Sequence, residues 1–161
     1  MAGANPALWR ARALATLVPA SLLAGAYAFQ YVGGLFPCEM CWWQRYAHFA
    51  ALALALLGWL APARRWPVAL AGCALAVAGL LGLYHAGVEY HWWTGITECT
   101  SAVKFAAGGD PLAAIMAAPT VRCDEVQWKL FGISMAGYNF LISGAAAAMV
   151  LALLAKARKA G

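Results

Sequence analysis

Long runs of apolar residues, with few charged side chains between them, divide this chain of 161 residues. Each run approaches the roughly 20 apolar residues that an α-helix needs to cross a lipid bilayer. Backbone amides in lipid have to be paired within their own segment, so each run predicts a membrane-spanning helix. The predicted spans cover about residues 13–32, 45–63, 67–88 and 132–155. The pattern therefore predicts an all-α membrane protein, a bundle of four transmembrane helices.

The residues between the predicted spans form two connections on one side of the bundle and a tight turn, "APARRWP", on the other. The first connection, about residues 33–41, is short. The second, about residues 89–130, is long and rich in Gly, Pro, Thr and Asp. Within it, "DPLAAIMAA" begins with an Asp-Pro start signal and predicts a short amphipathic helix on the membrane surface. A loop of this length in a compact protein is usually functional or disordered.

The composition supports the membrane assignment. Hydrophobic residues make up 65% of the chain and charged residues only 11%, whereas a soluble domain is about 45–50% apolar and about 25% charged. The net charge of +5 would suggest nucleic acid only if the basic residues shared one exposed face. They flank the predicted spans instead, so we expect the lipid bilayer as a partner and no nucleic acid.

Charged residues also predict the orientation. One side of the predicted bundle holds both termini, the tight turn and a set of basic residues without any acid: Arg10, Arg12, Arg64, Arg65, Lys156, Arg158 and Lys159. The other side holds all 6 acidic residues. Cytoplasmic loops carry an excess of Lys and Arg. We therefore expect both termini on the cytoplasmic side of the membrane and the two connections on its outer side, which is the periplasm for a bacterial inner membrane.

A competing interpretation concerns the first apolar run. Basic residues, an apolar stretch and "AYA" at residues 26–28 are also typical of a secretory signal peptide. Cleavage there would leave three spans. The run stays apolar or aromatic to Phe36, which favours an uncut helix, and amino-terminal sequencing of the mature protein distinguishes the two.

The cysteines are unevenly placed. Cys38, Cys41, Cys99 and Cys123 all fall in the two predicted periplasmic connections or at the edge of a helix. Disulfides persist in that oxidising compartment. The fifth, Cys73, lies in the middle of the third span, where we expect a small buried apolar residue of the core.

Cys38 and Cys41 form a C-x-x-C motif that several functions share. Haem attachment needs a histidine next, but residue 42 is Trp, and a thioredoxin-like fold needs strands that the pattern does not predict. Zinc held by all four outer cysteines is the weaker alternative because no second C-x-x-C is present, so we expect no metal. A structural disulfide of this spacing would constrain little of the unfolded chain. The motif therefore favours redox chemistry.

The position of this pair adds a physical reason. Cys41 lies at or near the start of the second helix, where free backbone N–H groups and the helix dipole favour a thiolate. Arg45 follows four residues later, on the same helix face, and its permanent charge would stabilise negative charge nearby. An arginine at a span end also often reaches toward lipid headgroups, which is the alternative for Arg45.

Aromatic and imidazole side chains gather at the same face. Trp42, Trp43, Trp92 and Trp93 are typical of the aromatic belts at membrane surfaces. Together with His85 and His91 they could also line a pocket for a flat, apolar, redox-active ring. His48 lies within the second span, nearly on the face of Cys41.

Taken in order, these features resemble one family. A C-x-x-C before the second of four spans, an arginine four residues on and two cysteines in a long second outer loop resemble DsbB, the bacterial disulfide bond formation protein B. The segments that carry the resemblance are "PCEMCWWQR", the "AP" turn, "YHAGVE" and "CDEVQWKLFGISMAGYN". They cover nearly the whole chain. Departures are Glu39 between the cysteines, Gln44 where some members have an acid, and Ala136 where a proline is common.

The resemblance implies a thiol oxidase that depends on membrane quinone, ubiquinone or menaquinone. A soluble periplasmic thiol oxidase of the DsbA type would be the partner that it reoxidises. Cys99–Cys123 would be the disulfide that the partner attacks, with Cys99 in the mixed disulfide. Electrons would then pass to Cys38–Cys41 through a transient Cys38–Cys123 link. Cys41 would face the quinone, with Arg45 and one of the histidines, His85 or His91, beside it.

Three alternatives remain open at this stage. A relative of vitamin K epoxide reductase also uses C-x-x-C beside a quinone, but there the motif comes late in the chain. A specialised member of the DsbB family would serve one dedicated partner. In a structural membrane protein with two inert disulfides, replacing Cys41 by serine would only loosen the protein.

Overall fold

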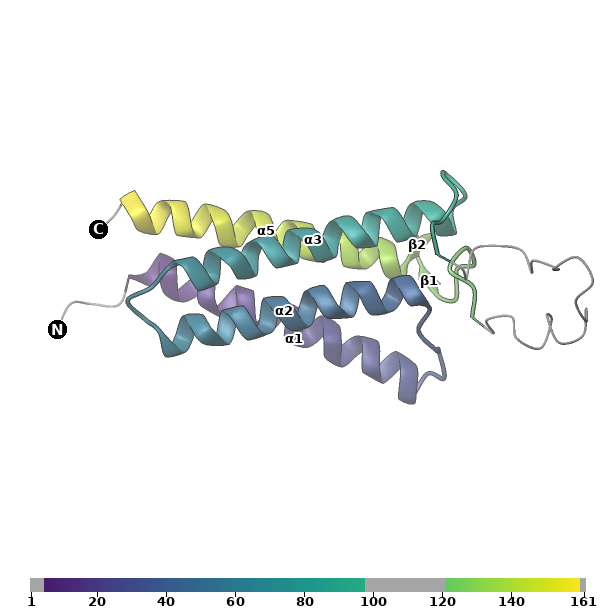
Figure 1. The fold of residues 1–161 in the computed structure, drawn as a ribbon, viewed down its shortest axis with the longest axis horizontal. Coiled ribbons are helices and arrows are strands. Elements are labelled where there is room, and N and C mark those ends of the chain that lie inside the picture. Colours follow the sequence, from purple (N-terminus) through teal and green to yellow (C-terminus); the bar gives the residue numbers. More distant parts are fainter. Residues whose placement is uncertain (1–4, 98–120, 160–161) are drawn as a thin grey trace, which may run out of the picture.

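The computed structural model describes residues 5–97 and 121–159. These residues form four long helices and one short hairpin: α1 (Pro6–Tyr31), α2 (Glu39–Leu60), α3 (Trp66–Glu89), β1 (Lys129–Leu130), β2 (Ile133–Ser134) and α5 (Met135–Lys159). The helices lie side by side in an elongated bundle, with both ends of the chain at one end (Figure 1). Both α1 and α3 pack against α2 and α5, while α1 has few contacts with α3. The predicted all-helical architecture is therefore present.

Three helices, α1, α3 and α5, are long and apolar enough to cross a membrane. α2 has 22 residues and includes the polar or charged side chains of Glu39, Arg45 and His48. A fourth span at α2 therefore stays a prediction. The helices begin earlier than the predicted spans at α1 and α2, because capping residues and polar first turns extend a helix beyond its apolar part.

The helix starts follow from local chemistry. Asn5 accepts hydrogen bonds from the backbone nitrogens of Ala7 and Leu8, and Pro6 occupies the first helical position. Both features are typical of a helix start, because the first N–H groups have no partner within the helix. Asn5 also donates to the carbonyl of Ala157 at 3.3 Å, which joins the start of α1 to the end of α5.

Small apolar side chains fill the end of the bundle that holds the termini. The buried residues there are Ala11, Ala15, Ala55, Val68, Ala71, Val150 and Leu154. Small residues let helix backbones approach closely in membranes, where van der Waals contact drives association. Further along, α5 lies close to α3 at Gly82: a Cβ there would lie 2.8 Å from the carbonyl oxygen of Ala136. Glycine is thus required at this crossing.

A two-residue turn closes the hairpin before α5. Phe131 and Gly132 both have positive φ, 50° and 79°, as a tight hairpin turn of the type I′ class needs. The hydroxyl of Tyr90, which follows α3, donates to the carbonyl of Gly132 and accepts from the nitrogen of Ser134, both at 2.8 Å. The sequence did not predict this hairpin, because strands of two residues carry no recognisable periodicity.

The structure contradicts the sequence prediction for Cys73 and does not describe the residues of two others. Cys73 is not a core residue: it is exposed on the protein surface of α3, so the prediction of a buried position was wrong. It lies on the outward face of its helix, because Ala71, Gly72 and Leu75 occupy the inward face. The short helix expected around residues 110–118 and Cys99 both lie outside the described residues.

Candidate active site

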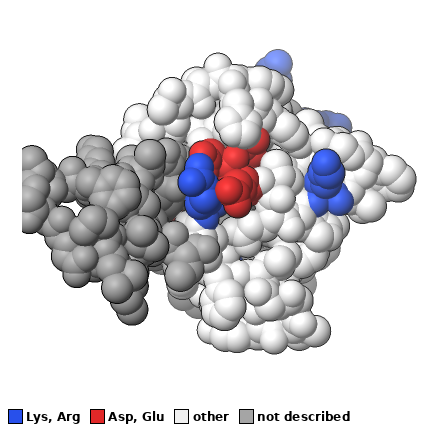
Figure 2. Space-filling view, turned by 90° about the vertical axis from the view of Figure 1, so that its right-hand side faces the viewer, with Lys and Arg blue, Asp and Glu red and all other residues white. Residues whose placement is uncertain are grey.

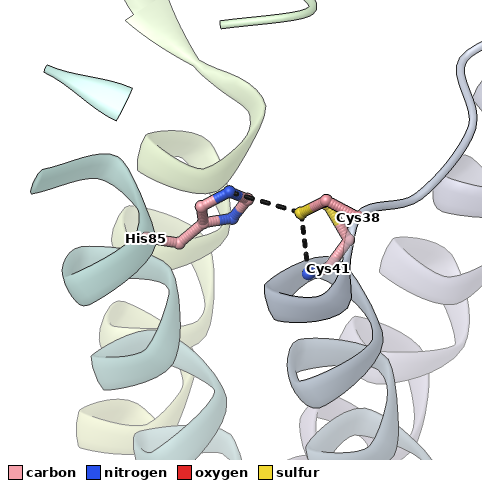
Figure 3. A group of neighbouring side chains, drawn as sticks. All are labelled: Cys38, Cys41 and His85. Carbon is pink, nitrogen blue, oxygen red and sulfur yellow. Dashed lines mark hydrogen bonds between the residues drawn. The ribbon is translucent and has the colours of Figure 1, made fainter. Parts of the chain in front are cut away.

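The C-x-x-C pair forms the first turn of α2. Cys38 is the residue that caps this helix, and its sulfur accepts the backbone N–H of Cys41 at 3.3 Å. The two sulfurs are 3.0 Å apart. Across from them, α3 presents His85, whose Nε2 is 3.5 Å from the Cys38 sulfur (Figure 3). The sequence predicted that the pair lies at a helix start, with free N–H groups near the Cys41 sulfur. In the structure, the backbone N–H of Cys41 donates to the Cys38 sulfur instead.

Cys123 joins the pair from the second connection. It is fully buried and packs with Cys38, Met40 and Val88, and Thr97 donates to its sulfur at 3.5 Å. The pKa of the Cys38 thiol is raised, first by its hydrogen bond with Cys123, then by that with Cys41 and by burial. The fold therefore brings Cys123, which is distant in sequence, to the C-x-x-C pair.

A cavity of about 330 Å³ opens beside the pair. Of the two cysteines, Cys41 lines the cavity and Cys38 does not. The wall is supplied mainly by α1 and α5, by the first connection and by the hairpin region. Its aromatic residues are Phe29, Phe36, Trp128 and Tyr138. The C-x-x-C pair thus has two sides, one toward the cavity and one toward Cys123.

Arg45 is held at the cavity by several groups at once. Its guanidinium donates to Gln30 Oε1 at 2.6 Å and to the carbonyl of Ala26 at 3.2 Å. It lies over the rings of Tyr27 and Trp42, with centroids 4.8 and 4.9 Å away. Among the described residues no carboxylate forms an ion pair with it. An arginine that is 6% exposed and has no anionic partner leaves its charge available to a ligand.

A chain of polar side chains crosses the bundle below the cysteines. Gln44 contacts His85 Nδ1 at 2.9 Å, and Asn139 of α5 donates to Gln44 Oε1 at 2.7 Å. Asn139 Oδ1 in turn contacts Ser143 and His48, at 2.7 and 2.9 Å. All five side chains are buried. Polar groups inside a membrane bundle are costly unless paired, so their presence marks a functional region.

In the part of the chain that the structure describes, four charged residues line the cavity: Arg45, Glu89, Arg122 and Glu125. Glu89 lines the cavity, lies 3.9 Å from His85 Nε2, and has one oxygen without a hydrogen-bond partner among the described residues. Nearer the surface, Arg122 pairs with Asp124 at 2.6 Å and with Glu125 at 3.0 Å. The view onto this end of the bundle shows acidic and basic side chains together on a largely uncharged face (Figure 2).

The structure brings together most, but not all, of the residues predicted for the site. Cys41, Arg45, His48 and His85 line the cavity. His91 does not: it is exposed, with φ of 59°, in the turn after α3. The four tryptophans expected around a ring do not line the cavity either; they are Trp42, Trp43, Trp92 and Trp93.

Sequence reasoning missed several residues of the site. The aromatic wall comes from Phe29, Trp128 and Tyr138, and the polar chain depends on Gln44 and Asn139. Asn139 carried a usable signal, since an amide in an otherwise apolar span is a functional candidate. The aromatic wall carried none, because which aromatic residues meet is decided by helix packing.

Comparison with known proteins is consistent with this geometry. A family model described as disulfide bond formation protein DsbB matches residues 9–153. Disulfide bond formation protein B of Verminephrobacter eiseniae is 33% identical over 155 residues, which cover 91% of this chain and 86% of the relative. The protein of that name from Aromatoleum aromaticum is 34% identical over 154 residues, covering 88% and 89%. No solved structure matched the chain significantly.

Proposed function

Because the chain belongs to the family of disulfide bond formation protein DsbB, we propose that it is a protein-disulfide:quinone oxidoreductase. It would oxidise a soluble periplasmic thiol oxidase of the DsbA type and pass the electrons to membrane quinone. Membership of the family supports a disulfide oxidoreductase. The quinone and the partner are the parts that we propose here.

The single observation that carries the proposal is the two-sided C-x-x-C pair. Cys41 lines a largely apolar cavity, while Cys38 packs against Cys123. A relay between a water-soluble dithiol and a lipid-soluble oxidant needs one sulfur within reach of each. Two inert disulfides would need neither the cavity nor the adjacency of three cysteines.

The cavity residues fit a quinone ring. Aromatic walls suit a flat apolar ring, and preformed sites of about 300–1,000 Å³ with few polar groups are typical of small-ligand pockets. Arg45 would donate hydrogen bonds to a ring oxygen, and Phe29 and Trp128, whose ring centroids are 5.0 Å apart, would cover one wall. When bound, the quinone would supply a two-electron acceptor that returns the Cys38–Cys41 dithiol to a disulfide.

The protein part of the relay balances as thiol–disulfide exchange. The partner's dithiol would reduce Cys99–Cys123 through a mixed disulfide at Cys99, so that the partner leaves oxidised. The Cys123 thiolate would attack Cys38, forming Cys38–Cys123 and releasing Cys41 as a thiolate with the electron pair. Cys99 would then attack Cys123, restoring that disulfide and releasing the Cys38 thiolate. Such exchange needs accessible thiolates with good leaving groups.

The proposed membrane arrangement follows from the charges at the two ends of the bundle. The end with both termini would face the cytoplasm of a bacterium, and the cysteine end the periplasm, with the helices in the inner membrane. α2 would be the fourth span. Seven basic residues at the first end, and the positive-inside rule, support this orientation: Arg10, Arg12, Arg64, Arg65, Lys156, Arg158 and Lys159.

The test uses purified full-length protein in detergent, a reduced DsbA-type partner and a soluble ubiquinone or menaquinone analogue. Loss of the quinone's ultraviolet absorbance is followed for the wild type and for Cys41→Ser. We expect turnover in the wild type and only the uncatalysed background in Cys41→Ser, because the sulfur at the cavity is gone. Cys73→Ser, on the outward face of α3, is the matched control and keeps full turnover.

Two results would contradict the proposal. Absence of turnover with both quinone classes, in folded protein with its cysteines intact, would favour inert structural disulfides. Turnover that persists in Cys41→Ser would move the acceptor site elsewhere. Activity with one purified partner but not with other DsbA-type proteins would identify a specialised member of the family.

A further inference from the structure

The polar chain between Cys38 and α5 has a direction that its hydrogen bonds determine. The amide nitrogen of Asn139 lies 3.0 Å from the backbone carbonyl of Ala78 and 2.7 Å from Gln44 Oε1. A backbone carbonyl only accepts, so the nitrogen of Asn139 has to face it. Both amide hydrogens of Asn139 are then used, and its oxygen is left as an acceptor.

Gln44 is fixed by the same argument. Its amide nitrogen lies 3.1 Å from the carbonyl of Met40, which only accepts, and 2.9 Å from His85 Nδ1. One hydrogen of this nitrogen goes to Met40 and the other to His85. His85 Nδ1 is therefore an acceptor, and a neutral imidazole with a bare Nδ1 carries its hydrogen on Nε2.

The hydrogen bonds at the other end of this series of polar side chains agree with the assignment. Asn139 Oδ1 lies 2.7 Å from Ser143 Oγ and 2.9 Å from His48 Nε2. Both of these groups can donate, as the acceptor role of Oδ1 requires. Every contact along the chain is thus satisfied by one arrangement of hydrogens, and turning either amide would place two acceptors face to face at a backbone carbonyl.

We propose that Gln44, itself oriented by Asn139, holds His85 with its hydrogen on Nε2, so that His85 is a fixed hydrogen-bond donor to the Cys38 sulfur and not a base that removes its proton. The Nε2–Sγ distance of 3.5 Å suits an N–H donor to sulfur. His85 would then contact a reacting atom, while Gln44 and Asn139 are positioning residues. This inference rests on the proposed function for the step that it serves.

That step is the release of Cys38. When Cys99 attacks Cys123, the Cys38–Cys123 bond breaks and the electron pair stays on the Cys38 sulfur. Burial and the neighbouring sulfurs of Cys41 and Cys123 disfavour a charge on this sulfur, and the backbone N–H of Cys41, 3.3 Å away, offsets them only in part. A donated N–H stabilises the leaving thiolate without requiring a proton transfer. Hydrogen bonds to charged groups are about twice as strong as neutral ones.

The test measures the reactivity of the Cys38 thiol, without quinone or partner. Full-length protein carrying Cys41→Ser is reduced in detergent, and alkylation of Cys38 by iodoacetamide is followed by peptide mass spectrometry from pH 6 to about 10. This range brackets the ordinary thiol pKa near 8.5. Because no turnover is involved, a failure of the proposed function leaves this measurement intact. Unfolding midpoints of all variants are recorded alongside.

Two substitutions of His85 separate a donor from a base. In His85→Leu we expect alkylation at neutral pH to fall about tenfold to a hundredfold, the value of a hydrogen bond to a charged group. In His85→Gln, which offers an amide N–H but does not titrate, we expect a rate within about threefold of the parent. The exposed His91→Leu is the matched control and leaves the rate unchanged.

Substitutions of Gln44 test the positioning step. Gln44→Met frees the ring to adopt the other tautomer or to turn away, so we expect a smaller loss of about two- to tenfold. Gln44→Glu places a carboxylate at His85 Nδ1 and favours the doubly protonated ring, so alkylation should become faster and the profile should shift to lower pH. If His85→Leu does not fold, His85→Gln, Gln44→Met and Gln44→Glu still distinguish a donor from a base.

Several outcomes overturn the proposal. An equal loss in His85→Gln and His85→Leu would make His85 a base. An unchanged rate in His85→Leu would remove it from the reaction altogether. Gln44→Met and Gln44→Glu behaving alike would show that the orientation of the ring does not depend on Gln44.

Discussion

At the end of the bundle that holds the termini, the helices meet through alanine, valine and leucine side chains, as at Ala15, Val68 and Val150. At the opposite end they meet through thiol, imidazole and amide groups, as at Cys38, His85 and Asn139. The first end is closely packed with small apolar residues. The second contains the cavity and the buried polar chain.

This difference predicts that the bundle separates stability from reactivity. The small apolar side chains at the terminal end are closely packed and leave no room for added volume, but none of them is a reactive group. The polar chain in the cysteine end is satisfied by specific hydrogen bonds, which fix side-chain orientation more than they add net stability. Substitutions in the two ends should therefore affect different measurements, and the predictions below test that separation.

The largest expected effect in the cysteine end, after loss of a cysteine, is that of Arg45→Met. It removes the one buried guanidinium known to line the cavity among the described residues. We expect kcat/KM for the soluble quinone to fall by about a hundredfold or more, as for loss of one preorganised donor at a developing charge. Steady-state quinone reduction at saturating partner measures it.

Arg64→Met, an exposed arginine of the opposite end, is the control for this change and should keep its kcat/KM. If Arg45→Met lowers the unfolding midpoint but leaves kcat/KM intact, the guanidinium is a structural group. That result would contradict the division of the bundle into a structural end and a reactive end at Arg45.

An intermediate effect is expected from overpacking the terminal end. Ala71 is fully buried in that core, so Ala71→Leu should lower the free energy of unfolding by about 1–3 kcal/mol. The KM for quinone should stay unchanged, because the cavity lies at the other end. Denaturant unfolding in mixed micelles and steady-state kinetics measure the two quantities separately.

The matched control is Ala148→Leu, the same substitution at an exposed position of α5. It should leave both quantities unchanged. A raised KM in Ala71→Leu at full saturation with partner would show that packing in the terminal end does reach the site, which would contradict the separation.

The smallest effect concerns the ion pair at the surface of the cysteine end. The hydrogen bond from Arg122 lowers the pKa of Asp124. A carboxyl with a lowered pKa in the folded state contributes stability above its unfolded pKa, about 3.9, and loses it as the pH falls through the lower folded value. Asp124→Asn should therefore slightly lower the unfolding midpoint at neutral pH.

The pH dependence sharpens this last prediction. The difference between wild type and Asp124→Asn should begin to shrink below about pH 4 and disappear below the lowered pKa of Asp124 in the folded state. It should also shrink in high salt because exposed pairs are screened. Thermal unfolding at neutral and acidic pH measures it. A difference that persists in acid would have to come from something other than the charge of Asp124.

Much of the fold could be read from the sequence, for identifiable reasons. Runs of apolar residues predict helices because lipid offers no partner to backbone amides, and the structure has helices at all four predicted runs. Cys38 and Cys41 at the start of a helix, with Arg45 one turn later, follow from spacing alone. His85 was singled out because an imidazole is unusual at that depth.

Other features needed the packed structure. In the structure, Cys38 packs against Cys123 while Cys41 lines the cavity. The spacing of the cysteines does not predict this, because two residues of one helical turn can point in different directions. Cys73 was placed in the core because its surroundings are apolar, but in lipid both faces of a helix are apolar. His91 lies six residues from His85, and a turn at the end of α3 takes it away from the cavity.

The sequence by itself determined the membrane class, the helices and the place of the C-x-x-C pair at a helix start, because these depend on local composition and on the chemistry of neighbouring residues. Only the tertiary structure decided how Gln44 and Asn139 orient His85. Those contacts join residues of different helices that are 41 and 95 positions apart in the chain. Their geometry is set by how closely the small residues of the helices allow the backbones to approach.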